Sequence, residues 1–192
     1  MALITFLSGA PGSGKSTWAK RHQEMTTAAN EGKPMVFVLS RDKFRDIMRA
    51  TVGVENYFPV STPMEFDLWS RYVVSFIDWI DDSAEIIIDQ TNTNQKGFKR
   101  MLKYIQEHSD SAKEGKLKYR IVNFKTPYPL CLANNHRREG RAYVPDNVIK
   151  DMYDKHQTFL KEQLLRIGVI GEYNVEIEEA LANGESKCCI YK

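Results

Sequence analysis

The chain has 192 residues, of which 42% are hydrophobic and 27% charged, and its formal net charge is +2 at pH 7. This length suits one domain with a sizeable core, and a balanced charge is not that of a dedicated, strongly basic nucleic-acid binder. No apolar stretch is long enough to cross a membrane, and the first strand leaves no room for a signal peptide. The three cysteines lack metal spacing and fit reduced thiols in a cell interior. We therefore expect a single cytoplasmic domain over residues 1–192.

The first predicted strand, residues 3–7, runs into a glycine-rich loop. Residues 9–16 read GAPGSGKS and match the phosphate-binding pattern G-x-x-x-x-G-K-[ST] at every fixed position. In such a loop backbone N–H groups surround phosphates, the lysine adds charge, and the last hydroxyl binds Mg²⁺. We expect Lys15 to be exposed to bound phosphate and not packed in the core. The residues predicted to bind ATP with Mg²⁺ are Gly9, Gly12, Ser13, Gly14, Lys15, Ser16 and Thr17.

Strand and helix patterns alternate along the rest of the chain, which is typical of an α/β fold with a parallel sheet flanked by helices on both faces. Buried strands are predicted at residues 35–39, 86–89 and 118–124. Helices are predicted at residues 17–30, 40–50, from 63 onward, around 98–105, at 130–138 and from 145 onward. Ligands of such sheets bind outside the carboxyl ends of the strands, so residues there are expected to face the nucleotide.

Three further segments carry specific expectations. Thr62-Pro63-Met64-Glu65 has the form of a capping box with proline in the first helical turn. Residues 109–115 are polar and predict a surface loop. The last strands are predicted around Val169 and at residues 187–191.

Two aspartates lie at or just after the ends of predicted strands. Asp89 is expected to bind Mg²⁺ through water or to bind the Ser16 hydroxyl, although a simple strand-end turn would also accommodate an aspartate. Asp42 lies within Arg41-Asp42-x-x-Arg45, where it fits both a helix cap and a general base for a substrate hydroxyl. The flanking arginines, Arg41 and Arg45, are expected to hold an anionic substrate.

The surroundings of the loop favour a kinase over other phosphate chemistry. A guanine-reading Asn-Lys-x-Asp motif is absent from the sequence, and Asp89 is followed by Gln90 where a hydrolase usually carries a glutamate that orients water. A kinase needs a carboxylate for the acceptor hydroxyl and cations over the phosphates. The predicted activity is therefore that of an ATP-dependent phosphotransferase with an alcohol-group acceptor.

Two basic clusters stand out. Arg137, Arg138 and Arg141 lie within five residues at the end of the helix at 130–138, and we predict that they form a lid over the ATP phosphates, at about residues 130–145. The other cluster surrounds one helix, and we interpret it as a solvated face. Its members are Lys96, Lys99, Arg100 and Lys103.

Over about residues 3–155 the chain resembles the kinase domain of phage polynucleotide 5′-hydroxyl kinases. The resemblance is carried by residues 7–20, Arg41-Asp42-x-x-Arg45, residues 89–94 and residues 135–152. It implies that Asp42 is the general base and Arg138 the main lid arginine, and the loop motif adds Lys15 as a catalytic residue. It also implies that Arg45 binds the phosphate beside the acceptor hydroxyl and that Val144, Pro145 and Val148 line the acceptor. Thr91, just beyond a predicted strand, is also expected to bind substrate.

The chain departs from that family at three places. The lid is one residue longer before Val144, Asn134 replaces a second lid arginine, and Asp89-Gln90 replaces Ser-Asp. No phosphatase motif follows, so we expect no end-healing phosphatase activity. The leading acceptor is the 5′-hydroxyl of DNA or RNA. Alternatives are 5-hydroxymethyluracil within phage DNA, as in related phage kinases, a nucleoside or other small molecule, and a non-catalytic nucleotide-binding regulator. No membrane or protein partner is expected.

Overall fold

A computed structural model describes residues 1–32, 35–52, 62–165, 175–180 and 186–189. Within these ranges six strands form one sheet with the order β2-β3-β1-β4-β5-β6. The strands β1 to β5 run parallel, and β6 is antiparallel to β5. Their bounds are β1 Ala2–Ser8, β2 Val36–Ser40, β3 Glu85–Asp89, β4 Leu117–Phe124, β5 Val175–Ala180 and β6 Ser186–Cys189. The predicted α/β class is confirmed, and the strand predicted around Val169 lies outside the described residues.

The helices are α1 Lys15–Ala29, α2 Arg41–Val52, α3 Pro63–Trp79, α4 Gln95–His108, α5 Asp110–Lys113, α6 Tyr128–His136 and α7 Asp146–Leu165, with a 3₁₀ turn, η1, at Gly140–Ala142. The surface loop predicted at residues 109–115 is wrong, because α5 lies there. Ser109 is fully buried; its hydroxyl accepts a bond from the N–H of Ala112 and donates to Asp78 at 2.7 Å. Within this polar segment, Ser109 is therefore the N-cap of α5. Among the described residues, none of the helices is long and apolar enough to cross a membrane.

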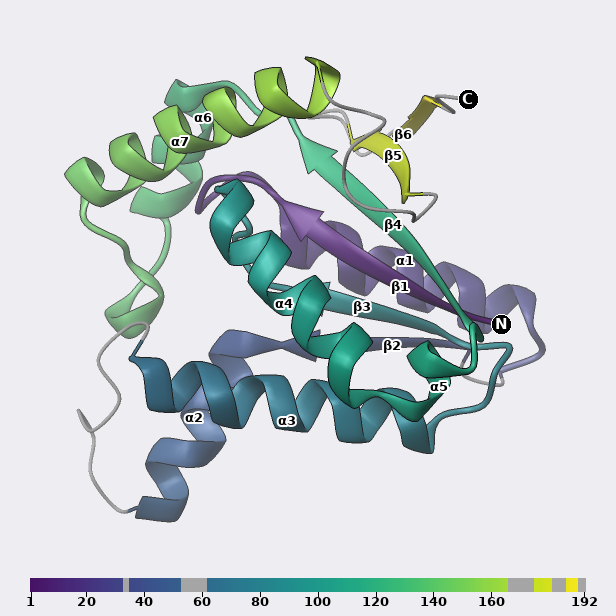
Figure 1. Ribbon diagram of the computed structural model, residues 1–192. Coiled ribbons are helices and arrows are strands. Elements are labelled where there is room, and N and C mark those ends of the chain that lie inside the picture. Colours follow the sequence, from purple (N-terminus) through teal and green to yellow (C-terminus); the bar gives the residue numbers. More distant parts are fainter. Residues whose placement is uncertain (33–34, 53–61, 166–174, 181–185, 190–192) are drawn as a thin grey trace.

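Alternate residues of the central strands pack on opposite faces of the sheet. Ile86 and Ile88 belong to one core cluster together with Trp69 of α3 and residues of α4, whereas Ile87 packs with Trp18 and others of α1 in a second cluster. Figure 1 shows the same division, with α3 and α4 in front of the sheet and α1 behind it. The unbroken apolar run of β3 is therefore explained by burial on both faces.

The carboxyl ends of the parallel strands meet at one edge of the sheet. The register pairs Ser40 at the end of β2 with Asp89 at the end of β3, while β1 ends at Ser8 beside Asn123 of β4. The helices α6 and α7 lie above this edge in Figure 1. This edge therefore collects the loop after β1, the first turn of α2 and the loop after β3.

Candidate active site

The phosphate-binding loop is fixed by backbone conformations and by direct contact with α6. Gly12 and Gly14 have φ values of 78° and 97°, which side chains other than glycine rarely adopt. A Cβ atom on Gly12 would lie 2.2 Å from the carbonyl oxygen of Cys131. The Asn134 amide donates to the Gly12 carbonyl at 2.9 Å, and the Thr126 hydroxyl donates to the Ser13 carbonyl at 2.8 Å. The loop is thus held from two further segments of the chain.

Lys15 is buried, contrary to the expectation that it is exposed. Only 7% of the residue is accessible, and its Nζ donates to the carbonyl oxygens of Gly9 and Ala10, both at 2.8 Å. Burial lowers the pKa of Lys15 from 10.5 to about 8, against the opposing charge of Asp89. The ammonium group therefore lies inside the loop, where its charge can meet a phosphate that the loop N–H groups bind.

Ser16 and Asp89 meet as predicted. The Ser16 hydroxyl donates to Asp89 Oδ2 at 2.7 Å. Burial raises the pKa of Asp89, while the Ser16 hydrogen bond and the charge of Lys15 oppose the rise. One hydroxyl and one carboxylate suit Mg²⁺, which is commonly held by few protein oxygens together with phosphates and water. Among the described residues no group of three His, Cys, Asp or Glu side chains forms a metal site of its own.

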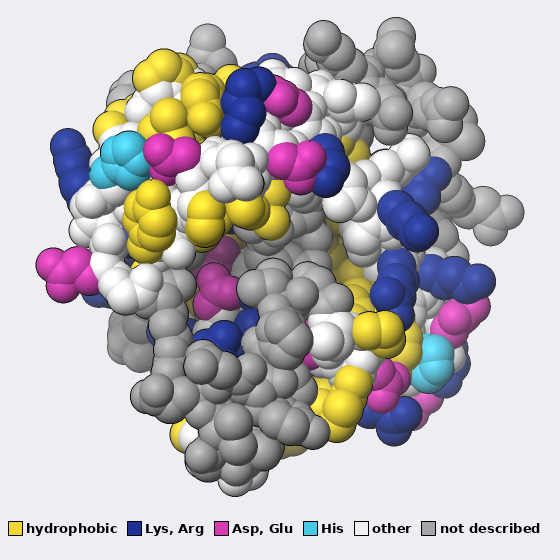
Figure 2. Space-filling model, turned by 90° about the vertical axis from the view of Figure 1, so that its left-hand side faces the viewer, with side chains coloured by type: hydrophobic (Ala, Val, Ile, Leu, Met, Phe, Trp, Pro, Cys, Tyr) yellow, Lys and Arg dark blue, Asp and Glu magenta, His cyan; other side chains and the backbone are white. Residues whose placement is uncertain are grey.

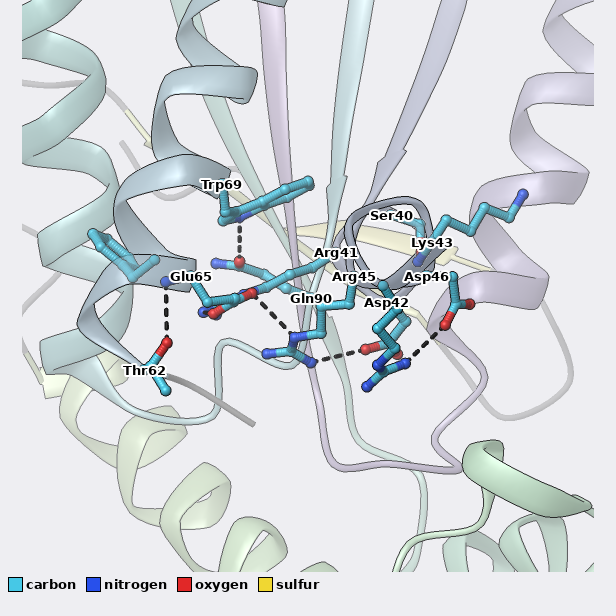
Figure 3. A network of polar contacts seen from close by, with 12 residues as sticks. Ser40, Arg41, Asp42, Lys43, Arg45, Asp46, Thr62, Glu65, Trp69 and Gln90 are labelled. Carbon is cyan, nitrogen blue, oxygen red and sulfur yellow. Dashed lines mark hydrogen bonds and ion pairs between the residues drawn. The ribbon is translucent and has the colours of Figure 1, made fainter. Parts of the chain in front are cut away.

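Asp42 lies in the first turn of α2, and its side chain is 90% exposed. The interpretation of Asp42 as a helix cap finds no support, because the Ser40 hydroxyl accepts the bond from the N–H of Lys43, at 3.4 Å. Instead, Asp42 Oδ1 accepts a bond from Arg45 Nη1 at 3.0 Å (Figure 3). Its charge also acts on Lys15 and Asp89 across the carboxyl edge of the sheet. Asp42 therefore has an accessible carboxylate near the phosphate-binding loop.

A buried glutamate that sequence reasoning assigned only to a capping box holds the two predicted acceptor arginines. The Thr62 hydroxyl caps α3 at the N–H of Glu65 as expected, but the Glu65 carboxylate points away from the cap (Figure 3). Its oxygens accept bonds from Arg41 Nε at 2.8 Å and Arg45 Nε at 3.0 Å, and Arg41 Nη2 adds a further contact. Burial would raise the pKa of Glu65, but the bonds and charges of Arg41 and Arg45 hold it below 4.5.

Gln90, which follows Asp89, is a structural link between α3 and the loop after β3. Its carbonyl oxygen accepts a bond from Trp69 Nε1 at 2.9 Å, and its amide donates to Asn92 Oδ1 at 2.6 Å. Asn92 has a φ of 40° and donates to the Leu7 carbonyl. The amide at position 90 is occupied in these contacts and offers no carboxylate to activate water.

The predicted lid is closed at its base by Asn135, which is fully buried. Its amide donates to the Val144 carbonyl at 2.7 Å and its oxygen accepts from the Val144 N–H at 3.0 Å. Sequence reasoning included Asn135 in the stretch that carries the family resemblance but assigned it no role. The exposed chain between these residues carries Arg138, whose charge acts on Lys15 and Asp89.

The other predicted site residues differ in how the structure places them. Arg137 ends α6 and is exposed, and the Arg141 side chain lies outside the described residues. The Thr91 carbonyl accepts a bond from the Gly9 N–H at 3.0 Å, which ties the loop after β3 to the phosphate-binding loop. Val144 is half-buried against the cluster of Ala10, Cys131 and Ile149. Thr17 and Pro145 are exposed and Val148 is half-buried.

A tight glycine loop with an internal lysine, at the carboxyl edge of a parallel sheet and beside a Ser–Asp pair, defines a P-loop nucleotide-binding protein. Residues 4–159 match a family of AAA domains (AAA_33), and the chain belongs to this family.

Solved structures similar to this chain share its fold. A structure from the PezAT toxin-antitoxin system of Streptococcus pneumoniae has a TM-score of 0.63 and 14% identity, covering 97% of this chain and 69% of that one. The AvrRxo1-ORF1:-ORF2 structure with ATP has a TM-score of 0.61 and 14% identity, and the match covers 98% of this chain and 57% of that chain. Kti12 of Chaetomium thermophilum, in complex with ADP-AlF3, has a TM-score of 0.51 and 13% identity, with 79% of each chain covered.

Proposed function

We propose that the protein is an ATP-dependent kinase that transfers the γ-phosphoryl group to a hydroxyl on nucleic acid, with the 5′-hydroxyl of DNA or RNA as the leading acceptor. The observation that carries the proposal is the accessible Asp42 carboxylate, which is paired with Arg45 and whose charge acts on Lys15 of the phosphate-binding loop. A kinase requires such a proton acceptor for the hydroxyl, whereas a nucleotide-binding regulator does not.

The proposed reaction assigns separate tasks to the acceptor half of the site, with Asp42, and to the nucleotide half, with the phosphate-binding loop. Asp42 accepts the proton as the acceptor oxygen bonds to the γ-phosphorus and the bond from that phosphorus to the β–γ bridging oxygen breaks, releasing ADP. Lys15 and Arg138 stabilise the negative charge that develops on the transferred group. Ser16 and Asp89 would hold Mg²⁺, which when bound supplies further charge neutralisation at the phosphates.

The arginine pair supports a substrate that carries phosphate next to the reacting hydroxyl. Glu65 occupies only part of each guanidinium fork, so Arg41 and Arg45 keep N–H groups for a second anion. Their side chains are 16% and 12% exposed, so an anion there would be partly removed from water and bound more strongly. A neutral sugar or free nucleoside makes no use of this pair.

The experiment is an acceptor panel with γ-labelled ATP. It contains DNA and RNA oligonucleotides with a 5′-hydroxyl, the same strands with a 5′-phosphate, a 5′-phosphorylated duplex carrying 5-hydroxymethyluracil, free nucleosides and gluconate. We expect label only on strands with a 5′-hydroxyl, and none with the Asp42→Asn variant. Label on the 5′-phosphorylated hydroxymethyluracil duplex alone would show that the acceptor is the modified base and not the 5′-hydroxyl. Label on nucleosides or gluconate alone would overturn the nucleic-acid proposal.

A further inference from the structure

We infer that the exposed basic face of α4 binds the acceptor strand beyond its first phosphate, so that the preferred substrate is a polynucleotide several nucleotides long. This inference rests on the proposed function. The basic face consists of four exposed side chains: Lys96, Lys99, Arg100 and Lys103. Figure 2 views the molecule toward the carboxyl edge of the sheet, and basic side chains gather to the right of its central hollow, over the face formed by α3 and α4.

The charges of this face are not explained by the stability of α4. The cations begin in the first turn of the helix, which contains no acidic residue, and the helix dipole disfavours positive charge at that end. Glu107 pairs with Lys103 at 3.5 Å in the last turns. Within the described part of the chain, no ion pair joins Lys96, Lys99 or Arg100 to a carboxylate. A face that only keeps a helix solvated usually alternates the signs of its charges, whereas residues 96–103 carry four cations and no carboxylate before Glu107.

The basic face is joined to the predicted acceptor site through one aromatic ring. Phe66 follows Glu65 at the start of α3, and the guanidinium carbon of Arg100 lies 3.7 Å from its ring centroid. The guanidinium carbon of Arg41, which Glu65 binds, lies 5.9 Å from the same centroid. Cations from α2 and α4 therefore share the Phe66 ring.

A groove continues from this ring between α3 and α4. It has a volume of about 270 Å³ and is lined by Phe66, Asp67, Arg100, Lys103, Tyr104 and Glu107. Arg100 and Lys103 lie along it, and Lys96 and Lys99 lie on the same helix. The two carboxylates of the lining are paired within the protein, Asp67 with Arg71 and Glu107 with Lys103. Basic surfaces with aromatic side chains are the usual means of binding a single nucleic-acid strand.

The spacing of charge selects a polymer over a small acceptor. A strand carries one negative charge for each nucleotide, so the phosphate next to the reacting hydroxyl reaches Arg41 and Arg45 while later phosphates continue toward α4. A nucleoside 3′-monophosphate ends at the first phosphate. The basic face should therefore affect long acceptors and leave the mononucleotide unaffected.

The test compares an octanucleotide that has a 5′-hydroxyl with a nucleoside 3′-monophosphate. The variant replaces Lys99, Arg100 and Lys103 by glutamine, and the matched control makes the same change in net charge at Lys20, Lys150 and Lys155, which are exposed on α1 and α7. Thermal melting verifies that both variants fold. We measure kcat/KM for each acceptor between 50 and 300 mM salt, and octanucleotide binding by fluorescence anisotropy.

We expect the α4 variant to lose about tenfold or more in kcat/KM for the octanucleotide at low salt, and the slope of log kcat/KM against log salt to fall by about 2, because each phosphate contact on a single strand contributes about 0.7. Its activity on the mononucleotide and its KM for ATP should stay within about twofold of wild type. The inference is overturned if the α4 variant and the control lose equally, or if the wild type uses the octanucleotide no better than the mononucleotide. If the wild type labels neither acceptor, the proposed function fails with it.

Discussion

The two halves of the site are built by different means. In the nucleotide half, backbone carbonyls and buried groups fix the geometry: Lys15 is 7% and Asp89 8% accessible. In the acceptor half, one buried carboxylate, Glu65, positions two arginines, and the reacting group that we assign, Asp42, has a side chain that is 90% exposed. Changes in the first half should therefore abolish ATP use, whereas changes in the second should act on the acceptor and leave ATP binding intact.

The largest effect is expected in the nucleotide half. Lys15→Ala should lower phosphoryl transfer by about 10³-fold or more, because Lys15 is the cation that the loop itself holds against developing phosphate charge. The fold should persist, since burial holds the pKa of Lys15 at about 8 and the native protein therefore disfavours its charged form. Transfer rates and melting temperatures are measured beside Lys20→Ala, an exposed lysine on the same helix. Activity near wild type would contradict the assignment of the loop.

Asp42→Asn should reduce turnover by about 10²–10⁴-fold by removing the proton acceptor. The helix cap stays in place because Ser40 provides it, and ATP affinity should hardly change. Single-turnover rates are compared with those of Asp46→Asn, which alters an exposed carboxylate one turn later in α2, paired with Arg49 at 2.8 Å. Equal rates for the two variants would leave Asp42 without a catalytic role.

Arg138→Ala should lower kcat by up to about 10³-fold and weaken ATP binding much less, since its charge acts on Lys15 and Asp89 within the site. Arg137→Ala and Arg141→Ala provide the comparison and should have smaller effects. The measurement is kcat and the ATP KM of all three variants. If Arg137→Ala or Arg141→Ala lowers kcat more than Arg138→Ala does, Arg138 is not the main lid arginine. The extra residue of the lid would then have shifted which arginine reaches the phosphates.

Glu65→Gln tests the acceptor half without touching a reacting group. A neutral amide cannot hold both guanidinium groups, so the KM for a phosphate-bearing acceptor should rise about tenfold while the KM for ATP is unchanged. The control is Glu85→Gln, because the Glu85 carboxylate also binds two basic side chains, His22 and Arg120, beneath α1 and away from the acceptor arginines. That variant should lower the melting temperature without an acceptor-specific effect. If Glu65→Gln lowered the melting temperature without raising the KM for the acceptor, Glu65 would be a purely structural residue.

The smallest effect concerns pH. Lys15 is protonated below its pKa of about 8 in the free protein, and bound phosphate favours the charged form and raises that pKa. ATP binding should therefore take up a proton above pH 8, and affinity should fall by up to tenfold for each further pH unit. Titration calorimetry at pH 7, 8 and 9, in two buffers of different ionisation enthalpy, measures both quantities. An affinity that does not change over this range would show that Lys15 stays charged in the free loop.

The contrast between the halves also explains how much the sequence alone could predict. The strand, the glycine loop and Lys15 are contiguous, and Asp89 ends an apolar strand, so local patterns located them and the sheet. The burial of Lys15 was missed because it depends on the carbonyl groups of Gly9 and Ala10, whose direction the motif does not specify.

Glu65 was missed for a different reason. Its ion pairs join α3 to arginines 20 and 24 positions earlier on α2, and the local pattern of Thr62 to Glu65 suggested only a capping box. Asn135 likewise acts on backbone nine residues away. Contacts between elements leave no periodic signal in one sequence, so the groups that hold the acceptor arginines could not be predicted from it.

The central claim is that the two halves together transfer phosphate to a hydroxyl and not to water. The most direct test follows γ-labelled ATP in one reaction and separates labelled strand from inorganic phosphate, using a 5′-hydroxyl oligonucleotide and its 5′-phosphorylated counterpart. We predict that most of the label enters the strand with the free hydroxyl, and that little phosphate is released with the blocked strand. Release of inorganic phosphate at one rate with either strand or with none, and no labelled strand, would contradict the account.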